Sequence, residues 1–142
     1  MVRFLIVLLA VTFIGGVSAA AEDPRTEISL PADMRDAFLE HMRDHMDSLD
    51  DVMSRLADGD FKGAAEVARE QLVRGSGKGF GRYLPIEFRE MGLAMHQAAA
   101  AFAETVENVQ TQPTAADWQE AMAALQEISA QCRNCHSSFR IE

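Results

Sequence analysis

Apolar residues recur at helical spacing through most of the chain. In four segments they follow alternating steps of three and four residues, the spacing of one face of an α-helix packed in a bundle. This pattern predicts helices over residues 31–57, 61–73 and 85–109, and a last helix that starts near residue 114. No run of alternating apolar and polar residues is long enough to predict a strand. The pattern therefore indicates an all-α fold.

The predicted helices are separated by residues that end one helix and cap the next. Gly59 is placed to end the first helix, and Asp60 is placed to cap the second. Thr114, followed three residues later by Asp117, resembles a capping box at the start of the last helix. The glycine-rich residues 74–84 are interpreted as a flexible connection, because a phosphate-binding loop would need a preceding strand. Four amphipathic helices with such connections predict an antiparallel four-helix bundle.

The expected buried faces of the first and last helices bear on function. On the first helix the expected core face consists of Leu39, Met42, Met46, Leu49, Met53 and Leu56, widened by Phe38, His45 and Val52. On the last helix it consists of Trp118, Ala121, Leu125, Ile128, Cys132, Cys135 and Phe139. The only two cysteines of the chain thus continue the buried face of the last helix.

The cysteines belong to a C-x-x-C-H motif, Cys132-Arg133-Asn134-Cys135-His136, which is the attachment site of c-type haem. Two thiols three residues apart lie on one helix face, where both can form thioethers to one porphyrin. His136 is then held beside the ring and can offer a nitrogen to the iron. A thioredoxin-like dithiol would need a βαβ context, and a zinc site would need two more ligands. We predict one covalently attached haem c, bound by Cys132 and Cys135, with His136 as the proximal iron ligand.

The N-terminal residues 1–19 have the features of a cleaved secretory signal. Arg3 precedes an apolar run, and residues 17–19 form a small-residue cleavage site. A membrane anchor is the alternative, but the run is too short to span a bilayer comfortably. Residues 20–30 are expected to be a flexible lead-in, and residues 31–142 the cytochrome domain. Export predicts a periplasmic protein, which suits haem attachment outside the bacterial cytoplasm.

The charge balance limits the choice of partners. The formal net charge of the chain is −9, and signal cleavage would make it one unit more negative by removing Arg3. Such an acidic protein is poorly suited to nucleic acid, whereas a basic redox partner protein is compatible with it. No membrane attachment is expected after signal cleavage. No residue pattern indicates a catalytic substrate, so an enzyme is not predicted.

The C-terminal motif, followed by Phe139 and Arg140, resembles that of the cytochrome c-prime superfamily. In this family a four-helix bundle carries its haem motif near the end of the last helix, followed by an aromatic residue and an arginine. The family usually has tyrosine where this chain has Phe139, so the phenol hydroxyl is absent. By analogy the first helix covers the distal face of the haem, and homodimers through the first two helices are frequent. Arg140, one turn after His136, is placed to pair with a haem propionate.

The resemblance implies two functions, according to the residue on the distal side of the iron. A methionine sulfur makes the iron six-coordinate and low-spin, as in electron carriers. Met42 is our first choice for this ligand because it lies about three turns into the first helix. An apolar residue, here Leu39, would leave a five-coordinate iron that binds nitric oxide or carbon monoxide. Single-electron transfer is the leading prediction, and gas binding is the alternative.

Other residues stay open as distal groups. Met46 lies on the same expected face, although methionine at helical spacing is more often core filling. His45 flanks that face and could give bis-histidine ligation, or act as the acid/base of a weak peroxidase, a less favoured function. His41 is expected on the polar side of the first helix. His96, beside the inner face of the third helix, is a weaker candidate than His45.

Overall fold

The computed structural model describes residues 22–73 and 79–142. The elements are β1 (Thr26–Ile28), α1 (Ala32–Ala57), α2 (Phe61–Val67), η1 (Ala68–Val73), η2 (Phe80–Arg82), α3 (Ile86–Glu107), α4 (Ala115–Ser138) and β2 (Phe139–Ile141). The predicted signal peptide and part of the glycine-rich connection lie outside the described residues. The prediction of an all-α four-helix bundle is confirmed.

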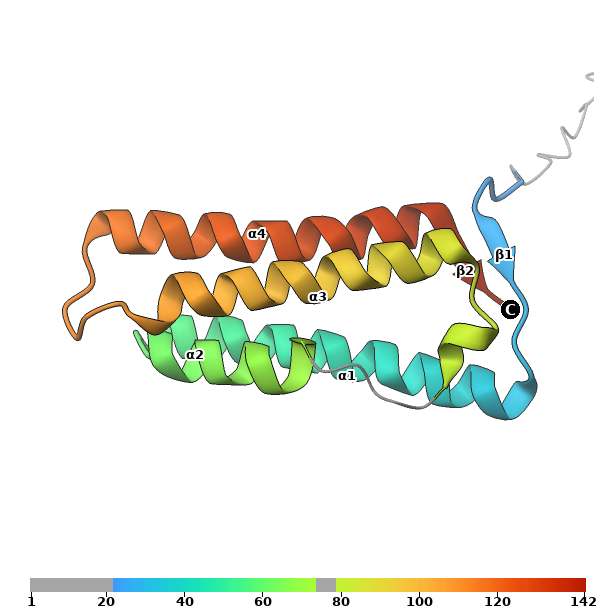
Figure 1. Ribbon diagram of the computed structural model, residues 1–142, viewed down its shortest axis with the longest axis horizontal. Coiled ribbons are helices and arrows are strands. Elements are labelled where there is room, and N and C mark those ends of the chain that lie inside the picture. Colours follow the sequence, from blue (N-terminus) through green and yellow to red (C-terminus); the bar gives the residue numbers. More distant parts are fainter. Residues whose placement is uncertain (1–21, 74–78) are drawn as a thin grey trace, which may run out of the picture.

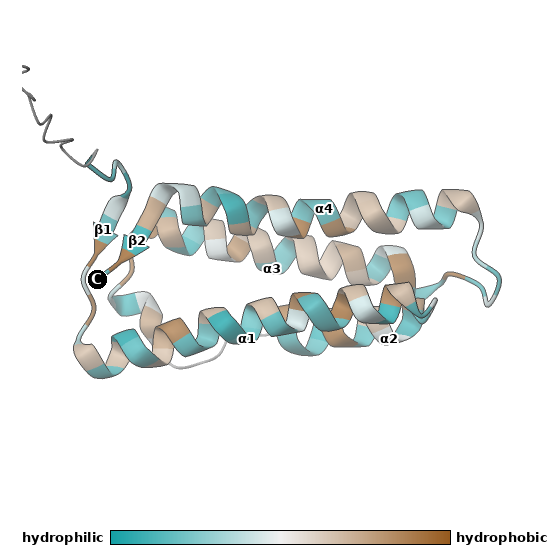
Figure 2. Ribbon diagram, turned by 180° about the vertical axis from the view of Figure 1, so that it is seen from behind, coloured by the Kyte–Doolittle hydropathy of each residue, from teal (hydrophilic) through white to brown (hydrophobic). Residues whose placement is uncertain are grey.

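The helices pack in two pairs (Figure 1). α1 packs against α2 and η1, α3 packs against α4, and contacts from α2 and η1 to α3 join the pairs. Hydrophilic residues alternate with hydrophobic ones along each helix, as expected for amphipathic helices (Figure 2). The core lies between the pairs, and its largest fully buried side chains are those of Val52, Leu72, Phe102, Val106 and Ile128.

The predicted helix caps are present. Gly59 follows α1 with a φ of 75°, a left-handed conformation that glycine adopts without steric cost. The Asp60 carboxylate accepts a hydrogen bond of 2.9 Å from the Gly63 N–H at the start of α2. At the start of α4 the Asp117 N–H donates to Thr114 Oγ1 over 3.2 Å, and the Thr114 N–H donates to Asp117 Oδ2 over 2.7 Å. This reciprocal pair is a complete capping box.

Replacing Thr114 by alanine is expected to lower the free energy of unfolding by about 1 kcal/mol, because the Asp117 N–H loses its acceptor. Urea unfolding of the purified protein measures the effect. Thr111→Ala is the matched control, since Thr111 is an exposed threonine in the preceding turn. Equal loss of stability in both variants would contradict the assigned role of the cap.

The sequence pattern predicted no strand, whereas the structure contains two short ones. β1 and β2 form a two-stranded parallel sheet, with Thr26 opposite Phe139 and Ile28 opposite Ile141. The sequence pattern missed them because each strand has three residues, too few for alternation to be visible. The pairing also depends on residues more than a hundred positions apart. Phe139, expected to continue the last helix, is instead the first residue of β2.

The expected buried face of α1 is displaced. Met46 and Met53, predicted to be core residues, are 58% and 44% exposed. The buried side chains of α1 are Phe38, Val52 and Leu56, all three predicted as core, and Ser48, which was not. The physical reason is that α1 packs mainly against α2 and η1, so the side carrying Val52 and Leu56 is covered. Met46 and Met53 lie beside the surface of α1 that α2 and η1 cover, and therefore stay exposed.

Candidate haem site

A cavity of about 520 Å³ lies at the end of the bundle where α1 begins and α4 ends, which is within the range of about 300–1,000 Å³ usual for cofactor sites. Its origin is the unequal length of the helices. α1 has 26 residues, whereas α2 and η1 have 7 and 6. The second helix therefore covers only about half of α1. The uncovered half of α1, together with α3, α4 and residues 79–84, forms the walls of the cavity.

One face of α1 lines the cavity, and its residues recur at steps of three and one. They are Phe38, His41, Met42, His45, Met46 and Leu49. Met42, Met46 and His45, all predicted as distal candidates, therefore reach the cavity. Leu39 lies outside this face and is not among the lining residues, so the structure does not place it where the gas-binding alternative needs it.

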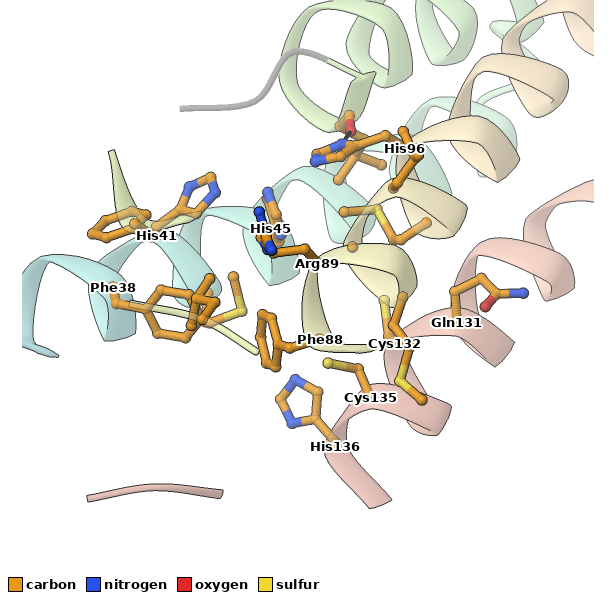
Figure 3. A pocket seen from close by; sticks show the side chains of 18 of the residues that line it. Phe38, His41, His45, Phe88, Arg89, His96, Gln131, Cys132, Cys135 and His136 are labelled. Carbon is orange, nitrogen blue, oxygen red and sulfur yellow. Dashed lines mark hydrogen bonds between the residues drawn. The ribbon is translucent and has the colours of Figure 1, made fainter. Parts of the chain in front are cut away.

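The C-x-x-C-H motif lines the opposite wall (Figure 3). Cys132, Cys135 and His136 all face the cavity from the last two turns of α4. The two cysteines are half-buried, and His136 is exposed. The residues between the cysteines, Arg133 and Asn134, are exposed to solvent. The helix therefore presents both thiols and the imidazole to the same space.

The state of the thiols argues against a redox-active dithiol. Burial, reinforced by the neighbouring Cys132, raises the pKa of the Cys135 thiol to about 11. Burial also raises the pKa of Cys132. A reactive dithiol instead needs a lowered thiol pKa. Within residues 22–73 and 79–142, no group of three or more His, Cys, Asp or Glu side chains is placed to hold a metal ion.

His45 occupies the wall of the cavity formed by α1. Its side chain is half-buried, and its Nε2 atom is buried without a hydrogen-bond partner. Burial, followed by the nearby His41 and His96, lowers the pKa of His45 to about 4, so the ring is uncharged at neutral pH. Leaving a buried polar atom unsatisfied costs about 1–3 kcal/mol. This atom is therefore a candidate for an interaction with a bound group.

His96 lies on α3 beside His45, and its orientation is fixed by the neighbouring helix. Its Nδ1 atom is hydrogen-bonded to the backbone carbonyl of Leu72 in η1. Because a carbonyl can only accept, Nδ1 is the donor in this bond and carries a proton. η1 is a π-helix, which the sequence did not predict and which is frequent at functional sites.

His41 was predicted on the polar side of the first helix, and this was wrong. The ring of His41 lies 4.2 Å from that of His45 and stacks on Phe80 of η2 at 5.9 Å, measured between ring centroids. Phe80 also packs edge-on against Phe38, with 5.3 Å between their ring centroids. The reason for the error is that η2 folds back over the start of α1 and gives His41 an apolar neighbour. Helical periodicity does not reveal such a contact.

The two strands hold the end of α4 next to the motif. Arg25 donates a hydrogen bond of 3.3 Å to the backbone carbonyl of His136. Arg140, predicted to pair with a haem propionate, forms ion pairs with Glu27 at 2.6 Å and Glu142 at 2.5 Å. Arg140 is not among the cavity-lining residues. A propionate would therefore have to compete with two carboxylates, and the propionate role of Arg140 stays a prediction.

Sequence reasoning missed several lining residues, among them Leu72, Arg89 and Gln131. Arg89 is the second charged residue of α3 and looks like an ordinary surface residue. Gln131 precedes Cys132 in the chain, and this adjacency was the one available signal. Phe38, which was expected only as a core residue, also lines the cavity, and so does Phe88.

The residues present fit a covalently bound haem. Both thiols and an imidazole reach one side of a mostly apolar cavity, and His45, whose Nε2 atom is buried without a partner, belongs to the other side. Apolar surroundings with few polar groups are typical of cofactor sites. The donor set, consisting of two thiols for the porphyrin and one or two nitrogens for iron, is that of a c-type haem.

Comparisons with known proteins agree with this interpretation. Residues 89–140, which run from α3 through the C-x-x-C-H motif to β2, match the model of the family described as Cytochrome C'. No curated protein and no solved structure matches the chain. Within the described part of the chain, no helix is long and apolar enough to cross a membrane. The family match covers just over a third of the chain, and together with the four-helix bundle it supports the cytochrome c-prime superfamily.

Proposed function

We propose that this protein is an exported c-type cytochrome that carries one electron at a time on a single covalent haem. The observation that carries the proposal is the convergence of Cys132, Cys135 and His136 on one wall of the cavity, with ligand-bearing residues of α1 on the other. Bound haem would supply reversible one-electron chemistry between ferric and ferrous iron. An enzymatic reaction is not part of this proposal.

The chain's own residues have distinct roles in this proposal. The thiols of Cys132 and Cys135 would add to the two vinyl groups of a haem as thioethers, and the His136 imidazole would bind its iron. Phe38 and Phe88, whose ring centroids are 5.7 Å apart, help to keep the cavity apolar. Water is thereby limited near the iron, which influences the reduction potential.

The sixth ligand decides between electron transfer and gas binding. Either the Met42 thioether or the His45 imidazole would complete a low-spin iron, and both residues line the cavity. The alternative is a five-coordinate haem that captures nitric oxide or carbon monoxide. With Leu39 outside the cavity wall, that function would depend on some other apolar residue above the iron.

The proposed setting is the periplasm, after removal of residues 1–19. The acidic surface suits a basic redox partner protein, and neither nucleic acid nor a membrane is proposed as a partner. A homodimer through α1 and α2 is proposed only by analogy with the family.

Optical spectra with and without carbon monoxide test the proposed function. The full chain is produced with haem-maturation machinery, and the intact mass reports signal removal and the attachment of one haem. We expect a low-spin ferrous spectrum that carbon monoxide leaves unchanged, because a side chain from α1 fills the sixth position. A high-spin spectrum that shifts with carbon monoxide would instead establish the gas-binding alternative.

A further inference from the structure

Three histidines gather on the cavity wall formed by α1 and α3, away from the C-x-x-C-H motif. His45 lies between the other two, with its ring centroid 4.2 Å from that of His41 and 6.0 Å from that of His96. Figure 3 shows this group across the cavity from Cys135 and His136. A second axial ligand has to come from the wall opposite His136, and this is where the histidines lie.

The hydrogen bonding of His45 sets it apart from its neighbours. Its Nε2 atom is buried and has no partner, whereas His96 is bonded through Nδ1 to Leu72. Buried polar atoms almost always have a partner, and an exception calls for an explanation such as a bound ion or ligand. An iron atom at Nε2 would satisfy this nitrogen.

Met42 differs from His45 because its side chain does not require a hydrogen-bond partner when it is buried. A thioether packs as an apolar, flexible group, and methionine commonly fills irregular space. Burial of Met42 beside the cavity is therefore explained without a bond to iron. Burial of the His45 nitrogen is not.

We infer that His45 Nε2, rather than the Met42 sulfur, is the sixth ligand of the haem iron. This inference rests on the proposed function, since it requires a haem attached at Cys132 and Cys135. It makes the protein a bis-histidine cytochrome. Because methionine ligation raises the reduction potential of a haem, histidine in its place indicates a carrier of lower potential.

Spectroscopy of the full chain with its haem attached tests this assignment. Ferric wild-type protein is expected to be low-spin and to lack the far-red band of an iron–thioether bond. His45→Ala is expected to lose the low-spin signal and to bind carbon monoxide. Added imidazole should restore the low-spin signal in this variant, which a merely structural role of His45 would not allow.

Two competing ligands and one control complete the set of variants. Met42→Ala and His96→Ala are both expected to keep the low-spin signal, since neither side chain is assigned to the iron. Met53→Ala is the control, because Met53 is an exposed methionine of α1 outside the cavity wall. Pulsed electron paramagnetic resonance of wild-type protein with isotope-labelled histidine should detect two axial histidine nitrogens. This last measurement tests the assignment even if the His45 variant does not fold.

The outcomes separate this inference from the proposed function. A far-red thioether band that disappears in Met42→Ala would overturn the assignment of His45 but leave electron transfer standing. If His96→Ala loses the low-spin signal and His45→Ala keeps it, the assignment of His45 is likewise overturned while electron transfer still stands. A high-spin wild-type protein that binds carbon monoxide would overturn both, and so would a chain that attaches no haem.

Discussion

Replacing both Cys132 and Cys135 by serine is expected to abolish covalent haem attachment completely. Serine has nearly the same shape as cysteine but cannot form a thioether. Both positions are half-buried at the cavity wall, and both thiols are uncharged because burial raises their pKa. The exchange therefore removes the reactive sulfur without adding a charge to the end of α4. Haem staining after denaturing electrophoresis, together with the intact mass, measures the loss.

Single substitutions and a control make this experiment specific. Cys132→Ser or Cys135→Ser alone should leave at most one thioether and a lower yield of haem-containing protein. Arg133→Ala is the control, because Arg133 lies between the cysteines and is exposed to solvent. It should retain one haem per chain. A double-serine protein that still carries haem after denaturation would show that the C-x-x-C-H motif is not the attachment site.

The helices and their ends were predictable because local sequence determines them. Asp60, Thr114 and Asp117 act on backbone groups within three residues, so their capping roles can be recognised without tertiary information. The buried face of α4 was also predicted well, since Ala121, Leu125 and Ile128 are all buried. Its continuation through the cysteines correctly placed the motif at the inner wall of the bundle.

Features that depend on how the helices are paired could not be predicted in the same way. The exposure of Met46 and Met53 follows from the choice of α2 and η1 as the main neighbours of α1. Periodicity shows which residues of a helix share an apolar face, but not which part of that face the neighbouring helix covers. The pairing of β1 with β2 likewise depends on Glu27 and Arg140, which are distant in the sequence. Long-range contacts of this kind leave no local pattern.

The candidate site combines both kinds of information. The motif itself is local, and its chemistry follows from the spacing of its residues. The cavity exists because the second helix stops halfway along α1, and the sequence did indicate that this helix is short. What the sequence could not provide is the burial of His45 Nε2 and the hydrogen bond that fixes His96. The hydrogen bond of His96 depends on the π-helical turn of η1, which carries Leu72, and the burial of His45 depends on neighbours that include His96 of α3.

Replacing His136 by alanine is expected to abolish the native axial ligation while the thioethers at Cys132 and Cys135 remain. The physical reason is that covalent attachment and iron ligation use different residues of the same motif. The ferrous and ferric spectra should both change, and the reduction potential should shift, because the proximal ligand largely determines the electronic state of the iron. Optical spectroscopy, supported by a mass that still includes the haem, measures this separation of roles.

The matched control for His136 is Ser137→Ala, at the next residue of α4. Ser137 is exposed, and its hydroxyl donates to the backbone carbonyl of Arg133 over 2.6 Å. Loss of that bond should leave the haem spectrum of the protein unchanged. The decisive comparison is between these adjacent positions. If His136→Ala also keeps the wild-type spectrum, the proximal ligand must be another residue. If the spectrum changes only in His136→Ala, and imidazole added to that variant restores it, the imidazole of His136 is the group that binds the iron.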